Sequence, residues 1–268
     1  MLKAALNTSA CTQPLQATLL GLLLLSMASL ASAADNIATD TTQIVNTKSI
    51  VDCHTDIETQ TPSYKYQSTP QRVLNCMIKQ LQPYQQKDKT ARQQYLAYKA
   101  QAWLNYAIHQ DSMNSRSPAG PMAVDMAESI LQALKNDTTQ DIALQQDIPT
   151  TSALMRPDLW ATLSALKDSD GIESAPREMA FSEVALIWAA TNQCERGWRE
   201  SGIHFRMADR WLEQAREAYV NAHDSQTNVA LEQAIVSYYK QYAPLDASDD
   251  VCRGQILTPL NNNKKADN

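Results

Sequence analysis

The pattern of apolar and polar positions is dominated by one hydrophobic segment in the second half of the chain. Seven apolar residues follow one another from Val184 to Ala190, and a helix that is apolar on all sides is a buried helix. A run this short also fits a buried strand. Polar helix-forming residues on both flanks and the lack of nearby turn residues favour the helix. We therefore predict a buried helix that starts at Pro176 and is joined near Gly202 to a second helix.

The other helices are predicted from apolar residues spaced three or four positions apart, which line one face of a helix. The partner of the buried helix runs from Ile203 to Ala222, and its stripe consists of Phe205, Ala208, Leu212, Ala215 and Tyr219. Similar stripes, separated by proline, glycine and polar residues, occupy residues 70–82, 89–111, 122–135, 157–168 and 226–242. This pattern predicts an all-α fold in which antiparallel helical hairpins pack as a bundle or as a short array of the tetratricopeptide type.

The first 33 residues have the features of a secretory signal peptide. Lys3 supplies the positive charge, the segment Ala17–Leu30 is mostly apolar, and Ala31-Ser32-Ala33 matches the small-x-small rule for cleavage. The alternative is an uncleaved membrane anchor, for which the apolar segment is short, since a span needs about 20 residues. We therefore expect a periplasmic protein with no membrane span after cleavage, and association with the outer membrane is left open.

The domain boundaries follow from composition. We predict a signal peptide at 1–33, an extended leader at 34–69 that is rich in small polar residues, one helical domain at 70–243, and a flexible tail at 244–268. Removal of the signal peptide takes away one lysine and no acid, so the net charge changes from −6 to −7. An acidic chain without clustered lysine and arginine is a poor nucleic-acid binder, because such binding requires neutralisation of phosphates.

The cysteines predict two disulfides. Four cysteines follow the predicted signal peptide, and an even number in an exported protein is typical of disulfide pairing. Four cysteines allow three pairings, and the sequence alone does not fix which one forms. We favour Cys53–Cys76, which would join the leader to the first helix, and Cys194–Cys252, which would join the tail to the buried helix. The alternative is that the thiols are free and buried.

No catalytic motif is present. The sequence contains no Gly-rich phosphate loop, no G-x-S-x-G, no H-E-x-x-H and no C-x-x-C. The four histidines lie far apart in the sequence, so we expect neither a metal nor a cofactor. These features predict a protein that is not an enzyme.

Two clusters are candidates for binding a partner. The first is Arg156, Asp158 and Trp160 at a predicted helix start, and the second is Trp198 and Arg199 after the buried helix. In the functional interpretation they form a recognition surface anchored by Trp160. In the alternative, Trp160 packs into the core, Asp158 favours the positive end of the helix, Arg156 pairs locally, and the second cluster is a solvated helix turn.

Four segments resemble the helical region that precedes the OmpA-like peptidoglycan-binding domain in some Gram-negative cell-envelope proteins. In chain order they are KAQAWLNYA at 99–107, AESILQAL at 127–134, RPDLW at 156–160 and EVALIWA at 183–189. The resemblance covers about residues 89–219 and implies a periplasmic helical module associated with the envelope. The residues after Tyr242 are too few for an OmpA-like domain, so neither peptidoglycan binding nor its residues are carried over.

These observations predict an exported, non-catalytic helical module that binds an envelope protein or another periplasmic component. The alternative is a helical enzyme or small-ligand-binding protein with a site between the hairpins, close to Arg156, Asp158 and Trp198. A third possibility is a structural spacer of the envelope.

Overall fold

The structure is a computed structural model that describes residues 53, 69–145, 147–196, 198–246 and 252–260. By its contacts the chain divides into residues 1–49 and 50–268, and all described residues belong to the second unit. The predicted signal peptide lies outside the described residues. So does the predicted leader, apart from Cys53 and Thr69.

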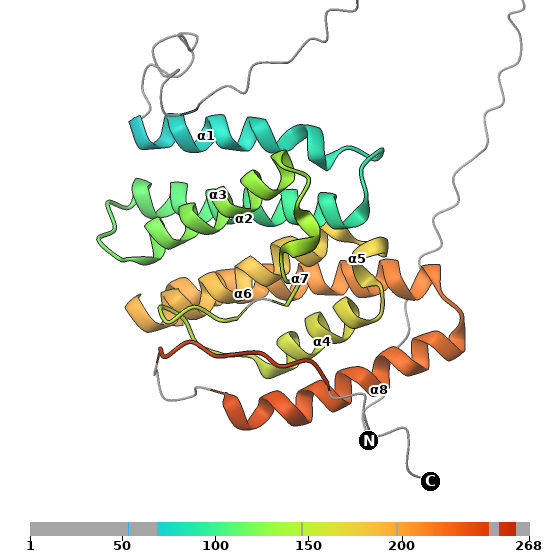
Figure 1. The fold of residues 1–268 in the computed structure, drawn as a ribbon. Coiled ribbons are helices and arrows are strands. Elements are labelled where there is room, and N and C mark those ends of the chain that lie inside the picture. Colours follow the sequence, from blue (N-terminus) through green and yellow to red (C-terminus); the bar gives the residue numbers. More distant parts are fainter. Residues whose placement is uncertain (1–52, 54–68, 146, 197, 247–251, 261–268) are drawn as a thin grey trace, which may run out of the picture. The chain divides into compact units, whose positions relative to one another are not determined.

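The described residues form eight α-helices and no β-strand, which confirms the predicted all-α fold (Figure 1). The helices are α1 (Thr69–Leu81), α2 (Ala91–Ser112), α3 (Ala119–Lys135), α4 (Pro157–Asp168), α5 (Gly171–Ser174), α6 (Pro176–Arg196), α7 (Trp198–Ala222) and α8 (Ser225–Tyr242), with 3₁₀ turns η3 (Gln82–Gln85), η4 (Thr139–Asp141) and η5 (Ala243–Leu245). None of these helices combines the length and the apolar character that crossing a membrane requires.

Local sequence signals set several helix starts. Thr90 caps α2 by accepting a hydrogen bond from the backbone N–H of Gln93, and the Gln93 side chain accepts one from the backbone N–H of Thr90. Asp224 caps α8 in the same way, through the backbone N–H of Thr227. Pro157 occupies the first turn of α4, where its missing N–H leaves no bond unmade.

The helices pair as hairpins. α2 packs against α3, and α6 packs against α7. α2 also packs against α6, which joins the two hairpins, while α1 packs against α2 and α3 (Figure 1). α4 packs against α8, the last helix. The α2–α6 contact includes the ion pair between Lys99 and Glu183 that is considered below.

The prediction that the central helix is buried is confirmed. Every residue of the apolar run in α6 is buried except Trp188, which is half-buried. The same helix also buries four polar residues that the apolar pattern does not indicate, namely Ser182, Glu183, Thr191 and Asn192. Burying polar groups is costly unless they are hydrogen-bonded. Ser182 and Thr191 donate to backbone carbonyls of α6 itself, whereas Glu183 pairs with side chains of α2 and α4.

The predicted junction at Gly202 is wrong. α6 ends at Arg196 and α7 begins at Trp198, so Gly202 lies within the second turn of α7. A β-carbon at Gly202 would meet nothing closer than 3.7 Å. A glycine inside a helix costs about 1 kcal/mol relative to alanine, which the packing of α7 on α6 easily outweighs.

Both favoured cysteine pairs lie at disulfide-bonding distance. The Cα atoms of Cys53 and Cys76 are 5.7 Å apart, and those of Cys194 and Cys252 are 6.1 Å apart. The first disulfide attaches Cys53 to α1, and the second attaches the C-terminal segment to the end of α6.

Part of the predicted C-terminal tail lies against the helices. Residues 252–260 form an antiparallel bridge between Gln255 and Ile148 and bury the side chain of Leu257. Gly254 has a φ of 68°, and a β-carbon there would lie 2.7 Å from the carbonyl oxygen of Ile148. Only glycine therefore allows this close approach of the two backbones. The remaining residues of the predicted tail are η5 and Asp246, which are described, and segments that lie outside the described residues.

Candidate functional site

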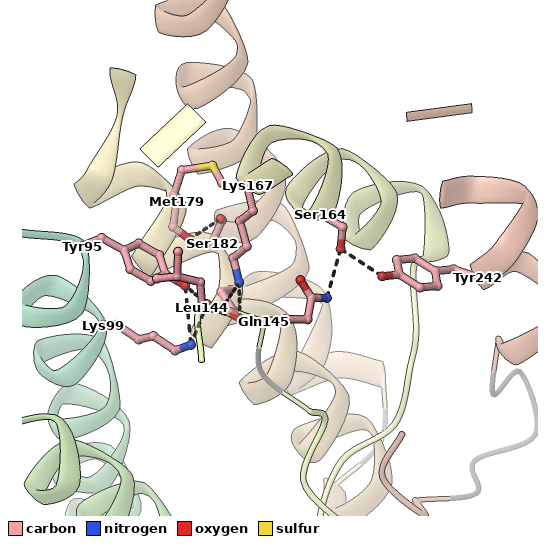
Figure 2. A network of polar contacts seen from close by, with 10 residues as sticks. Tyr95, Lys99, Leu144, Gln145, Ser164, Lys167, Met179, Ser182 and Tyr242 are labelled. Atoms are coloured by element: carbon pink, nitrogen blue, oxygen red, sulfur yellow. Dashed lines mark hydrogen bonds and ion pairs between the residues drawn. The ribbon is translucent and has the colours of Figure 1, made fainter. Parts of the chain in front are cut away.

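A buried cluster of charged side chains joins three parts of the fold. The carboxylate of Glu183 in α6 forms ion pairs with the ammonium groups of Lys99 in α2 and Lys167 in α4, with N–O distances of 2.9 Å and 2.6 Å. The hydroxyl of Tyr95 donates to the same carboxylate. The three charged side chains are at most 4% exposed. Figure 2 shows Tyr95 and Lys99 reaching in from one side and Lys167 from the other.

The pKa values in this cluster follow from burial and from the unequal number of charges. Burial raises the pKa of Glu183, but the ammonium groups of Lys167 and Lys99 outweigh it and hold the pKa at about 2. Burial lowers the pKa of Lys99 to about 8, against the attraction of Glu183, and the ammonium of Lys167 adds to the lowering. Burial and the adjacent carboxylate raise the pKa of Tyr95 well above its ordinary value.

This cluster is suited to structural positioning. Two ammonium groups share one carboxylate, and Lys167 also donates to the backbone carbonyl of Leu144 at 2.9 Å. None of these side chains lines either of the grooves described below. What the cluster does is fix α2, α4 and α6 in one register.

A second set of hydrogen bonds extends from α4 to the last helix (Figure 2). The Ser164 hydroxyl lies 3.1 Å from the Tyr242 hydroxyl, and the Gln145 amide donates to Ser164 at 3.5 Å. At the next turn the Tyr238 hydroxyl donates to Asp168. These contacts explain why Tyr238 and Tyr242 of α8 are buried although each carries a polar group.

Two of the hollows among the described residues are lined by more than one helix. The larger has a volume of about 470 Å³ and is formed by α1, α2 and the start of α3. We call it the N-terminal groove, and its lining is mostly apolar: Pro70, Val73, Leu74, Ala107, Gln110, Asp111, Ser115, Gly120, Pro121 and Val124. Its volume falls within the range of about 300–1,000 Å³ that is typical of ligand sites.

Gln110 is the unusual member of this lining. Its side chain is 2% exposed, and among the described residues neither its amide nitrogen nor its carbonyl oxygen has a hydrogen-bond partner. Leaving such a group buried and unpaired costs about 1–3 kcal/mol. The N-terminal groove therefore combines apolar walls with a polar group whose hydrogen-bonding capacity is unused.

The smaller hollow, which we call the aromatic groove, has a volume of about 240 Å³ and lies between α2, α6 and α7. Two ring pairs flank it: Trp188 stacks on His204 with centroids 4.0 Å apart, and Phe181 stacks on Trp211 at 5.4 Å. Burial, and to a smaller extent His109, lowers the pKa of His204 to about 4. His204 is therefore neutral at pH 7 and contributes to the stack as an uncharged ring.

The structure places the predicted binding residues at different depths. Arg156 and Asp158 form a bidentate ion pair at the surface, with a closest distance of 2.7 Å. Trp160 is 1% exposed and packs in the core, which fits the core interpretation of this residue. Arg199 is exposed on the first turn of α7, and the side chain of Trp198 lies outside the described part. Of the four residues whose side chains are described, none lines either groove.

The residues that form the cluster and the grooves carry weak sequence signals. Glu183 stands at the polar edge of the apolar run in α6, and its partners lie 84 and 16 residues away. A charge beside a hydrophobic run is the one signal that points to burial with a counterion. Gln110 lies near the end of a helix, where a polar residue is ordinary, so the sequence gives no indication of its burial.

Within the described ranges no group of three or more His, Cys, Asp or Glu side chains could hold a metal ion. Comparison of the chain with protein-family models, with curated proteins and with solved structures finds no match.

Proposed function

We propose that this protein is an exported, non-catalytic helical module of the cell envelope that binds a protein partner. Export is supported by the signal-peptide pattern of the first 33 residues. It is also supported by two cysteine pairs at disulfide-bonding distance, since disulfides persist in oxidising compartments.

Partner binding is supported mainly by the N-terminal groove. The titratable cluster around Glu183 is closed, whereas the groove is open and mostly apolar. Open apolar surface that is bordered by polar residues is typical of binding sites for proteins or ligands. A protein partner can insert an apolar side chain between α1 and α3, and helices on three sides would enclose it.

The test is photo-crosslinking in living cells. In one strain a photoreactive amino acid replaces Pro121, which is exposed at the rim of the N-terminal groove. In two further strains it replaces Met207 at the aromatic groove or Val236 on the outer face of α8. We expect position 121 to give one discrete protein adduct and position 236 to give none.

The matched control carries Val73→Asp, which places a charge in the wall of the N-terminal groove. We expect this change to remove the adduct at position 121 while the circular dichroism spectrum stays that of the wild type. If no position gives a protein adduct, the proposal that the protein binds a protein partner is wrong. If an adduct forms at Met207 alone, protein binding stands, but the N-terminal groove is not the site.

A further inference from the structure

The carboxamide of Gln110 needs an explanation that the apolar packing around it does not give. Buried polar side chains in proteins are nearly always hydrogen-bonded. Yet both polar atoms of Gln110 lack a partner among the described residues, although the side chain borders an open groove. This combination indicates hydrogen bonds that form only when the groove is occupied.

We propose that the N-terminal groove binds an extended peptide segment, and that Gln110 pairs with the main chain of one of its residues. The inference rests on the proposed function and names the chemical class of the ligand. In an extended chain the N–H and C=O of one residue point to the same side, as in a hydrogen-bonded strand pair. A carboxamide offers an acceptor and a donor next to each other. Oε1 of Gln110 can therefore accept from the N–H while Nε2 donates to the C=O.

Other apolar ligands fit this site less well. A helical ligand uses its own backbone groups for internal hydrogen bonds, so it would leave Gln110 unpaired. A lipid chain has no polar groups to offer along its length. An extended peptide supplies both free backbone groups and apolar surface. One of its residues pairs with Gln110, and the residue beside it can place an apolar side chain against Val73, Leu74 and Val124.

The approach of α3 to α2 keeps Gln110 out of bulk water. A β-carbon at Gly120 would lie 3.2 Å from the Cβ of Gln110, which is tighter than ordinary contact. The glycine thus lets α3 cross close to α2 at this level. Binding is expected to turn the carboxamide into the groove by a change of rotamer, a common adjustment at interfaces.

The experiment compares Gln110→Met, which keeps the length of the side chain and removes its hydrogen bonds, with Gln132→Met at an exposed position of α3. The probe is a library of random seven-residue peptides displayed on phage and selected against the full chain purified after export. We expect wild type and Gln132→Met to enrich peptides that share an apolar position, and Gln110→Met to enrich none.

A backbone readout follows from the same selection. The enriched peptide is synthesised with N-methylation at each residue in turn, and binding is measured by fluorescence anisotropy. Methylation of the paired residue removes its N–H, so we expect at least tenfold weaker binding to the wild type, which corresponds to about 1.4 kcal/mol. Gln110→Met should also unfold at the same temperature as the wild type or at a higher one, because the methionine replaces a buried amide that has no hydrogen-bond partner within the described part of the free protein.

Three results would overturn the proposal. The first is equal enrichment on wild type and Gln110→Met, or no enrichment on either. The second is a lower unfolding temperature for Gln110→Met, which would mean that the carboxamide is already satisfied in the free protein. The third is tight binding of every N-methylated peptide. If the crosslink at position 121 forms in cells while the library enriches nothing, protein binding stands and the extended-peptide proposal falls.

Discussion

Replacement of Glu183 by glutamine tests whether the buried cluster is held by charge. The change preserves the shape of the side chain and removes the one carboxylate that Lys99 and Lys167 share. At an effective dielectric constant of about 20, each ion pair at these distances represents about 6 kcal/mol of Coulomb attraction. Most of this attraction offsets the cost of burying the charges. Breaking a buried pair by removing one partner typically costs about 3–5 kcal/mol, and we expect Glu183→Gln to lose that much.

The pH dependence separates lost charge from lost packing. The pKa of Glu183 is about 2 in the fold against an ordinary 4.5, so its stabilisation is full above pH 4.5 and is lost as the pH falls to about 2. Wild type and Glu183→Gln should therefore converge in acid. On the alkaline side the pKa of Lys99 is about 8 against an ordinary 10.5. The folded protein releases this proton before the unfolded chain does, and stability rises between those two values.

Above pH 6 the stability of Glu183→Gln should depend on pH differently from that of the wild type. Without Glu183 the pKa of Lys99 falls further, because burial and the ammonium of Lys167 still lower it and the attraction of the carboxylate no longer opposes them. Release of the proton then relieves part of the cost in Glu183→Gln. We expect the deficit in the free energy of unfolding to be smaller at pH 9 than at pH 6.

The assay is urea unfolding at pH 3, 6 and 9, followed by tryptophan fluorescence and circular dichroism. Glu213→Gln, at an exposed position of α7, is the matched control and should change the free energy of unfolding by less than about 0.5 kcal/mol. Addition of Lys99→Met to Glu183→Gln removes one unpaired ammonium and should restore part of the loss. A deficit below about 1 kcal/mol at pH 6, or one that is the same at pH 3 and pH 6, would refute the electrostatic account.

Two further predictions concern covalent and backbone constraints. Replacement of Cys194 and Cys252 by serine should lower the free energy of unfolding by about 2–4 kcal/mol, since their disulfide closes a long loop. The same change should make the chain near Arg253 more sensitive to trypsin. Unchanged digestion would contradict the contacts described for residues 252–260. Gly171→Ala and Gly202→Ala form a matched pair that thermal unfolding compares. Gly171→Ala should destabilise the protein, because the new β-carbon would lie 2.6 Å from the carbonyl oxygen of Leu166, whereas Gly202→Ala should stabilise it by about 0.4–1 kcal/mol, because the space there is open. Equal shifts of the unfolding temperature in the two variants would count against this account of the backbone contacts.

The helices could be predicted from the sequence because their cause is local. A stripe such as that of α7, which includes Ala208, Leu212 and Tyr219, identifies a helix and its buried face in one step. The junction between α6 and α7 was mispredicted because the intrinsic penalty of Gly202 is small compared with tertiary packing. Helix boundaries depend on such small differences, whereas helix identity depends on many residues together.

The candidate sites could not be predicted, because they depend on contacts between distant residues. Lys99 looks like a solvated helix residue, and the position of Glu183 beside the apolar run indicates burial without identifying its counterions, until the α2–α6 packing brings the two together. Gln110 becomes unusual only when α1 and α3 enclose the end of α2. Conversely, the sequence singled out Arg156 and Asp158, whose bidentate pair is local, partly exposed and of the kind that contributes little to stability.

The disulfide between Cys194 and Cys252 has a mechanical consequence. α7 and α8 both lie within the loop that this disulfide closes. A pull on the C-terminus passes through the sulfur atoms directly to the end of α6, so it cannot draw α7 or α8 out one residue at a time. A protease that unfolds proteins by threading them from the C-terminus would therefore stall at Cys252 while the bond is intact, and reduction of that bond would let it proceed.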